Sequence, residues 1–335
     1  MCFDMIIDVV RHKFAEALLT MFFMAVVLMA VSLAMLDAEA VQVAEGGAIA
    51  PLRLWLDEVV AGHPLLSAFA TLPLFVYAVL TISRAVVRVG MYTSSTMAPI
   101  ALYAISVVAL VSCSQVIPLL VVASLLALAI ARLIRSLGPS VRAHRLFTSM
   151  IAFGALPLVD GSLLAISVLM PLLAILLRRT VRETVIILAG ALLPTFIFCY
   201  LSWCFGGSFV GAAQLLIDNM LNPPCVPLSD YLHLPRLIFV GLLLLTQLIA
   251  TLFYISERVS ISLGARSIWL ILILSLLLII PAFVMLPSFS AASILAVAMI
   301  SVAMIPLPIL RLGGLSGSLY FLIMLVLSIV TAISW

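Results

Sequence analysis

Long apolar runs, separated by short polar or charged stretches, recur along the whole chain. The runs are about 16–23 residues long, close to the roughly 20 residues that an α-helix needs to cross the hydrocarbon core of a bilayer. Alternating segments of about 10 residues, which are typical of membrane β-barrels, are absent from the sequence. The pattern therefore predicts an all-α, polytopic transmembrane helical bundle.

The runs predict about eleven spans within one integral membrane domain that covers residues 1–335. Some of these spans are short: Leu146–Leu158 gives only about 20 Å of helix, against a hydrocarbon core of about 30 Å. Short hairpins either thin the bilayer or leave their tips submerged among other helices. In chain order, the predicted spans are Phe14–Leu36, Leu65–Ser83, Ala98–Val111, Val116–Ile134, Leu146–Leu158, Gly161–Leu177, Thr184–Trp203, Arg236–Ile255, Ser267–Leu286, Ala291–Leu310 and Ser316–Ser334.

The stretch from Arg132 to Glu183 is expected to form a helical hairpin. Two apolar runs meet at Asp160-Gly161, a residue pair that favours a tight turn. The open end of the hairpin is basic on both sides, with Arg132, Arg135, Arg142, Arg145, Arg178, Arg179 and Arg182. These arginines are expected to fix the orientation of the neighbouring segments.

The distribution of basic residues predicts which side of the membrane each loop faces. With the N-terminus inside, every lysine and arginine except Arg53 and Arg236 falls in an inner segment. Positively charged loops stay on the cytoplasmic side, so the sequence predicts an inside N-terminus and an outside C-terminus. The net charge of +3 is then a signal of topology, and it does not indicate a nucleic-acid partner.

Two long stretches are predicted to lie outside the bilayer. Residues 37–64 form an acidic outer loop in which Pro51–Val60 is expected to be an interfacial helix, with an Arg53–Asp57 pair on its polar face. Its predicted apolar stripe consists of Leu52, Trp55, Leu56, Val59 and Val60.

Residues 205–235 form the second outer segment, whose proline-rich latter part is incompatible with a helix interior. A disulfide between Cys204 and Cys225 is one alternative for these two outer cysteines, and buried or interfacial thiols are the other.

Composition narrows the functional classes. Hydrophobic residues make up 66% of the chain, charged residues 9%, and the mean hydropathy is +1.40, which excludes a soluble domain. The chain contains no phosphate-binding loop, HExxH, CxxC, GxSxG or dinucleotide-binding fingerprint. Nucleotide hydrolysis, zinc proteolysis and serine hydrolysis therefore have no support, and no cofactor or metal is indicated.

The candidate catalytic residues are Asp37 and Glu39, which follow the first predicted span on the outer side. Two nearby carboxylates have the chemistry of a general base and of a ligand for a metal or phosphate group. The alternative is an ordinary acidic, solvated outer loop.

The candidate binding residues are few, and each has a structural alternative. Asp160 and Asp218 are carboxylates in outer, weakly polar surroundings where they would line a cavity, although Asp160 also suits a turn. His63 precedes a proline at a helix boundary. Arg84 and Arg88 lie one helical turn apart, a spacing that suits a lipid phosphate as well as topology alone.

Two stretches of the chain carry a family resemblance. SQVIPLLVVASLLALAIARLI and LLRRTVRETVIILAGALLPTFIFCY resemble an uncharacterised family of polytopic bacterial inner-membrane proteins. In that family an arginine–glutamate pair, here Arg182-Glu183, precedes a span broken by glycine and proline, here Gly190 and Pro194. The resemblance covers the central third of the chain and implies architecture, with no activity attached.

The overall plan is similar, more distantly, to that of family C glycosyltransferases. Asp37 and Glu39 stand where those enzymes have an acidic pair, Pro51–Val60 where they have an interfacial helix, and His63-Pro64 at the entry to the second span. This resemblance implies an outer-face catalytic base and a polyprenyl-phosphate-linked substrate. The small outer loops and alanine-rich acidic context depart from the family and are also compatible with a non-catalytic relative.

Three functions follow as hypotheses for a protein of the bacterial inner (cytoplasmic) membrane with membrane lipids as partners. The first is a glycan- or lipid-handling envelope protein resembling a family C glycosyltransferase, with or without catalysis. The second is a transporter or flippase that uses Asp160 or Asp218. The third is a non-catalytic scaffold subunit of an envelope complex, which the scarcity of charge within the spans favours.

Overall fold

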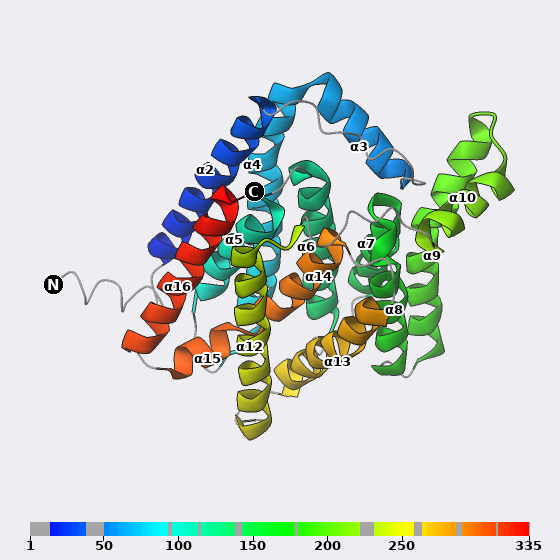
Figure 1. The fold of residues 1–335 in the computed structure, drawn as a ribbon. Helices are drawn as coiled ribbons and strands as arrows, with labels where there is room; N and C mark the ends of the chain where they lie inside the picture. Colours follow the sequence, from blue (N-terminus) through cyan, green and yellow to red (C-terminus); the bar gives the residue numbers. More distant parts are fainter. Residues whose placement is uncertain are drawn as a thin grey trace.

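The computed structural model describes a helical bundle, shown in Figure 1. Among the described residues every regular element is a helix. The described ranges are 14–37, 50–92, 96–112, 115–137, 143–177, 180–221, 231–257, 263–285, 290–312 and 314–334.

Each predicted span coincides with a helix or with a pair of consecutive helices. The elements are α2 (Phe14–Asp37), α3 (Pro51–Gly62), α4 (Pro64–Val89), α5 (Ala98–Val111), α6 (Val116–Ser136), α7 (Ala143–Val159), the 3₁₀ turn η1 (Gly161–Leu163), α8 (Leu164–Leu177), α9 (Val181–Cys204), α10 (Phe209–Leu221), α12 (Leu234–Glu257), α13 (Leu263–Met285), α14 (Ala291–Val302), α15 (Pro306–Arg311) and α16 (Gly314–Ile333).

Eight segments of the described chain are long and apolar enough to cross a membrane, so the chain is a multi-pass helical membrane protein. Three other predicted spans form shorter helices: α5 and α8 have 14 residues each, and α7 has 17. At 1.5 Å per residue these helices are about 21–26 Å long, less than the hydrocarbon core of about 30 Å. Short spans were expected here, and eleven complete crossings remain a prediction.

The centre of the bundle is formed by two helices: α5, whose side chains are all buried, and α14, in which every side chain except the half-buried Ala291 is buried. Around them, α2, α9, α12 and α16 expose large apolar side chains on the outer surface. An apolar perimeter is what a lipid-facing surface requires, because lipid offers no hydrogen bonds. The shortness of α5 is therefore compatible with a membrane, since neighbouring helices enclose it completely.

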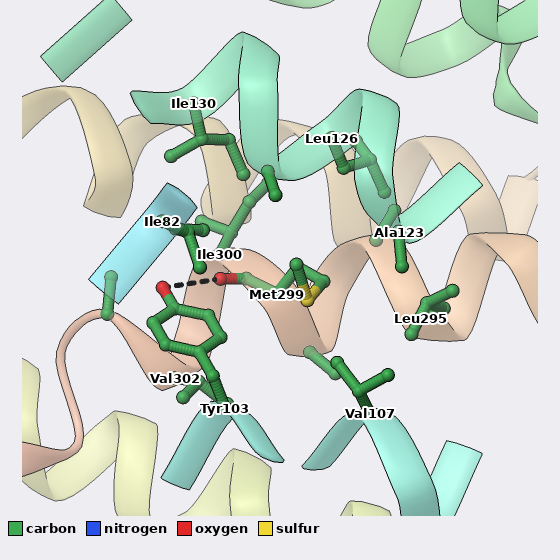
Figure 2. Close-up of a cluster of buried hydrophobic side chains, with 14 of the residues drawn as sticks. Ile82, Tyr103, Val107, Ala123, Leu126, Ile130, Leu295, Met299, Ile300 and Val302 are labelled. Atoms are coloured by element: carbon green, nitrogen blue, oxygen red, sulfur yellow. Dashed lines mark hydrogen bonds between the residues drawn. The ribbon is translucent and has the colours of Figure 1, made fainter. Parts of the chain in front are cut away.

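Figure 2 shows how the central helices pack. Ile82 of α4, Tyr103 of α5 and Leu126 of α6 meet Ile300 of α14 in a cluster whose side chains are at most 1% exposed. The hydroxyl of Tyr103 donates a hydrogen bond of 3.1 Å to the backbone carbonyl of Met299. A buried tyrosine hydroxyl needs such a partner, and this bond ties α5 to α14.

The predicted span Ala291–Leu310 is not one helix, because α14 ends at Val302 and α15 begins at Pro306. Pro306 and Pro308 lack backbone N–H donors, so the regular ladder of hydrogen bonds cannot continue through them. At the turn, the carbonyl of Ala303 accepts a hydrogen bond of 2.7 Å from the hydroxyl of Tyr92. A neighbouring side chain thus satisfies a backbone group released by the break.

The helix ends gather at two faces, as an alternating bundle requires. We call the end at which α3 lies the α3 face, and the opposite end the arginine face, because Arg88 of α4, Arg135 of α6 and Arg145 of α7 surround one hollow there. On the α3 face, α3 packs across the ends of α4, α6 and α7 (Figure 1). The arginines of α4, α6 and α7 therefore gather at one end of the bundle.

Helix α9 runs from Val181 to Cys204 without interruption and contains both Gly190 and Pro194. A Cβ on Gly190 would lie 2.8 Å from the Cβ of Met150, and one on Gly154 would lie 2.1 Å from the carbonyl oxygen of Ala191. These glycines permit the close approach of α7 and α9, which is a common use of small residues between membrane helices.

Candidate functional site: an arginine-lined hollow

Five arginines from three helices gather at the arginine face. Arg84 and Arg88 end α4, Arg132 and Arg135 occupy the last turns of α6, and Arg145 begins α7. Arg88 and Arg135 lie in the last turn of their helices, where a cation interacts favourably with the negative end of the helix dipole. Because α6 packs closely on both α4 and α7, the three helix ends are held together.

Three of these arginines surround a hollow of about 230 Å³, which is lined by Arg88, Val89, Arg135 and Arg145. Arg88 is exposed, whereas Arg135 and Arg145 are half-buried. The Nε atom of Arg135 is buried and has no hydrogen-bond partner. A buried donor left without an acceptor costs free energy, and the Nε of Arg236 is buried and unpaired in the same way.

The charge around the hollow has one sign. Arg135 experiences electrostatic repulsion from Arg88, Arg132, Arg145 and Arg84. Within the described part of the chain, no carboxylate lies within 4.0 Å of any of the five guanidinium groups. Guanidinium groups bind carboxylate and phosphate oxygens with two parallel hydrogen bonds. The arrangement can therefore bind an anion, and a planar or tetrahedral oxyanion fits its chemistry.

Of the residues predicted to bind a ligand, Arg84 and Arg88 lie in this cluster, and Arg88 lines the hollow. From the sequence, Arg135 and Arg145 were interpreted only as arginines that determine the orientation of the helices in the membrane. Their repeated positions at the open end of the hairpin were a signal, but a linear sequence does not show that α4 ends beside them.

Asp160 lies at the other face, between α7 and α8, and the predicted hairpin is confirmed. Its Oδ1 accepts a hydrogen bond of 3.0 Å from the backbone N–H of Ser162, and its Oδ2 lies 3.9 Å from Nη1 of Arg53. The side chain is 15% exposed. Asp160 therefore closes the turn and joins it to α3, which are structural tasks; a role in a cavity remains a prediction.

The predicted pair on α3 is present, with Nε of Arg53 3.7 Å from Oδ2 of Asp57. Burial raises the pKa of the Asp57 carboxyl, and the charge of Arg53 and its hydrogen bond oppose that rise. Arg53 thus bridges Asp57 on its own helix and Asp160 on the hairpin, although these surface pairs contribute little stability individually. On the predicted apolar stripe, Trp55 is 58% exposed.

The remaining predicted site residues do not converge. Asp37 is the last residue of α2, but its side chain and the whole of Glu39 lie outside the described residues, as does Cys225. His63 is exposed between α3 and α4, where its backbone carbonyl accepts hydrogen bonds from Ser67, as expected of a helix boundary. Asp218 is exposed on α10. Their catalytic or binding roles, and the pairing of Cys204 with Cys225, stay predictions.

One buried cation was missed by the sequence analysis. Arg236 is 2% exposed and donates hydrogen bonds to the carbonyls of Tyr231, at 2.8 Å, and Ser112, at 2.5 Å. The Tyr231 hydroxyl donates to the carbonyl of Leu110 at 2.6 Å. Both side chains satisfy carbonyls at the C-terminal end of α5, where helix carbonyls lack internal partners and favour a cation. We interpret Arg236 as a cap that joins α12 to α5.

Among the described side chains, no group of three or more His, Cys, Asp or Glu residues could hold a metal ion. No family model matches the chain, and neither a curated protein nor a solved structure is significantly similar to it.

Proposed function

We propose that this chain is a multi-pass protein of the bacterial inner membrane that handles an anionic lipid, and that the arginine-lined hollow binds the phosphate of that lipid. The observation that carries the proposal is the convergence of Arg88, Arg135 and Arg145, from three different helices, on one hollow without a carboxylate among the described residues. Arginines that served topology alone would have no need to share a hollow.

The charge distribution supports an orientation with the arginine face in the cytoplasm. Lysine and arginine accumulate on the cytoplasmic side of membrane proteins, and this face collects Arg84, Arg88, Arg132, Arg135 and Arg145. In this orientation the N-terminus is inside, the α3 face is outside, and α3 lies at the outer headgroup layer. Eleven crossings place the C-terminus outside.

The location of the hollow favours a lipid over a soluble anion. It lies where α4 and α6 end, and both are long enough to cross a bilayer, so its depth is that of lipid headgroups. The cytoplasmic leaflet is rich in anionic lipid, which attracts basic residues at this level. A polyprenyl phosphate offers the same chemistry as an anionic phospholipid and belongs to the proposed class of ligands.

The proposal concerns binding and handling of lipid, because the hollow supplies cations and no base. Of the two candidate catalytic residues, Asp37 ends α2 at the α3 face, and Glu39 lies outside the described residues. A glycosyltransferase would require a second site there. The hollow alone supports recruitment, gating or transfer of a lipid without bond cleavage.

The test is lipid retention by single arginine variants. The protein is placed in nanodiscs that contain a small fraction of anionic phospholipid in a zwitterionic background, and bound lipid is counted by native mass spectrometry. Arg135→Gln and Arg145→Gln are each expected to weaken retention about tenfold, since a hydrogen bond to a charged group is worth about 1.5–3 kcal/mol and 1.4 kcal/mol is tenfold.

Arg182→Gln is the matched control, because Arg182 is an exposed arginine at the start of α9 that does not line the hollow. It is expected to retain lipid as the unaltered protein does. If all three variants lose the same small amount of lipid, the hollow has no special role, and the arginines act only through their summed charge.

A further inference from the structure

We infer that the hollow selects a lipid whose headgroup ends in a phosphomonoester, in preference to the phosphodiester headgroups of ordinary phospholipids. This inference rests on the proposed lipid binding and specifies the headgroup. It comes from the number of cations around the hollow, from the three helices that carry them, and from the size of the hollow.

The first argument is charge. Arg88, Arg135 and Arg145 line the hollow, and Arg84 and Arg132 add to the repulsion that Arg135 experiences. A phosphomonoester carries a charge of about −1.5 to −2 at pH 7, with a second pKa of about 6. A phosphodiester carries a single negative charge. Because attraction scales with the product of the charges, the dianion gains about twice as much from each cation.

The second argument is the number of free oxygen atoms. A phosphomonoester presents three unsubstituted oxygens, whereas a phosphodiester presents two and carries carbon on both remaining sides. The lining guanidinium groups come from the ends of α4 and α6 and the start of α7, so they reach the hollow from three separate helices. A terminal phosphate offers one free oxygen to each of them, whereas a diester has only two free oxygens to share among three guanidinium groups.

The third argument is the space in the hollow. Arg88 on α4 is exposed, whereas Arg135 and Arg145 are half-buried. A phosphate at the end of a single chain can present its free oxygens to these guanidinium groups, but a diester would bring its second substituent into a space of about 230 Å³ that is lined mainly by guanidinium groups. Burying carbon against those cations gives no compensating hydrogen bond.

The experiment compares two lipids with the same acyl chains: phosphatidic acid, a phosphomonoester, and phosphatidylglycerol, a phosphodiester. Each is titrated into zwitterionic nanodiscs that contain the full chain, and occupancy is read by native mass spectrometry. The unaltered protein is expected to bind phosphatidic acid at least tenfold more tightly than phosphatidylglycerol at pH 7.5. At pH 5 the monoester is monoanionic, so this preference should fall severalfold while binding of phosphatidylglycerol is unchanged.

The variants locate the preference. Arg135→Gln and Arg145→Gln are expected to bring the two lipids to similar affinity, whereas Arg182→Gln should keep the full preference. Thermal unfolding of each variant shows whether it remains folded. Arg135→Lys keeps the charge but removes the planar guanidinium group, and this variant is expected to lose part of the preference for phosphatidic acid. That partial loss separates a built site from charge alone.

Inorganic phosphate, added as a competitor, distinguishes a lipid from a soluble ligand. Weak competition, at millimolar concentration, supports a lipid ligand. Competition as strong as that of phosphatidic acid would show that the hollow takes a soluble phosphate compound, and the proposed lipid function would fall while the monoester preference stood.

If instead both lipids bind equally and both depend on Arg135 and Arg145, the lipid function stands and the monoester preference is wrong. If neither lipid depends on these arginines, both are wrong.

Discussion

Replacing Gly154 by alanine should separate helices that are packed at backbone distance. A Cβ at this position of α7 would lie 2.1 Å from the carbonyl oxygen of Ala191 on α9 and 2.9 Å from its carbonyl carbon. Close contacts between carbon and a carbonyl oxygen begin at about 3.3 Å, so the helices must move apart by about 1 Å. Both obstructing atoms belong to the backbone, so no side-chain rotation relieves the contact.

The magnitude follows from two opposing terms. Alanine favours a helix over glycine by up to about 1 kcal/mol. Overpacking of a close interface costs about 1–3 kcal/mol. Gly241 of α12 is the matched control, because a Cβ there meets no atom within 4 Å. Gly241→Ala carries the first term only, so the difference in unfolding free energy between the two variants isolates the strain, at about 1–3 kcal/mol.

The assay is equilibrium unfolding of both variants and the unaltered protein in mixed detergent micelles, followed by circular dichroism. Gly190→Ala repeats the test from the α9 side, since its Cβ would lie 2.9 Å from the carbonyl oxygen of Phe147. Equal unfolding free energies for Gly154→Ala and Gly241→Ala, within about 0.5 kcal/mol, would refute the close packing of α7 and α9 as described.

Two further changes test the hydrogen bonds of Asp160 and of Arg236, each by the same unfolding measurement. Asp160→Ala removes the acceptor for the Ser162 N–H and should lower the free energy of unfolding by about 1 kcal/mol. Asp160→Asn keeps an acceptor and loses only the ion pair with Arg53, so it should lower the free energy of unfolding by less than about 1 kcal/mol. Equal losses of stability in the two variants would contradict the capping role. Arg236→Gln leaves the carbonyl of Ser112 without its charged donor and should cost about 2–3 kcal/mol, and a loss below about 0.5 kcal/mol would show that the C-terminal end of α5 does not need this cap.

The helices themselves could be predicted from the sequence because the information is local. A run of about 20 apolar residues in lipid has to form a helix, since backbone groups must find partners within the segment. The turn at Asp160-Gly161 and the Arg53–Asp57 pair depend only on neighbours in the chain, and both were predicted. The break between α14 and α15 was not predicted, although Pro306 and Pro308 lie within the predicted span. Hydropathy does not reveal that a proline lacks the backbone N–H donor of a regular helix.

The candidate site could be predicted only in part. Arg84 and Arg88 were predicted as candidates for binding a lipid phosphate because they lie one helical turn apart, which is a local relation. Their neighbours Arg135 and Arg145 belong to helices that begin or end far along the chain, and only the packing of α6 against α4 and α7 brings them together. The same reasoning applies to Arg236, whose acceptor Ser112 lies 124 residues away in sequence.

The sequence by itself determined the membrane class, the position of the helices and the sorting of charge, because hydropathy and the positive-inside bias act segment by segment. The tertiary structure alone decided which helices are enclosed, where glycine allows backbones to touch, and which arginines share a hollow. Those properties depend on contacts between distant segments. Arginines that are equivalent in the sequence become different when packing places Arg135 beside the hollow and buries Arg236 against the end of α5.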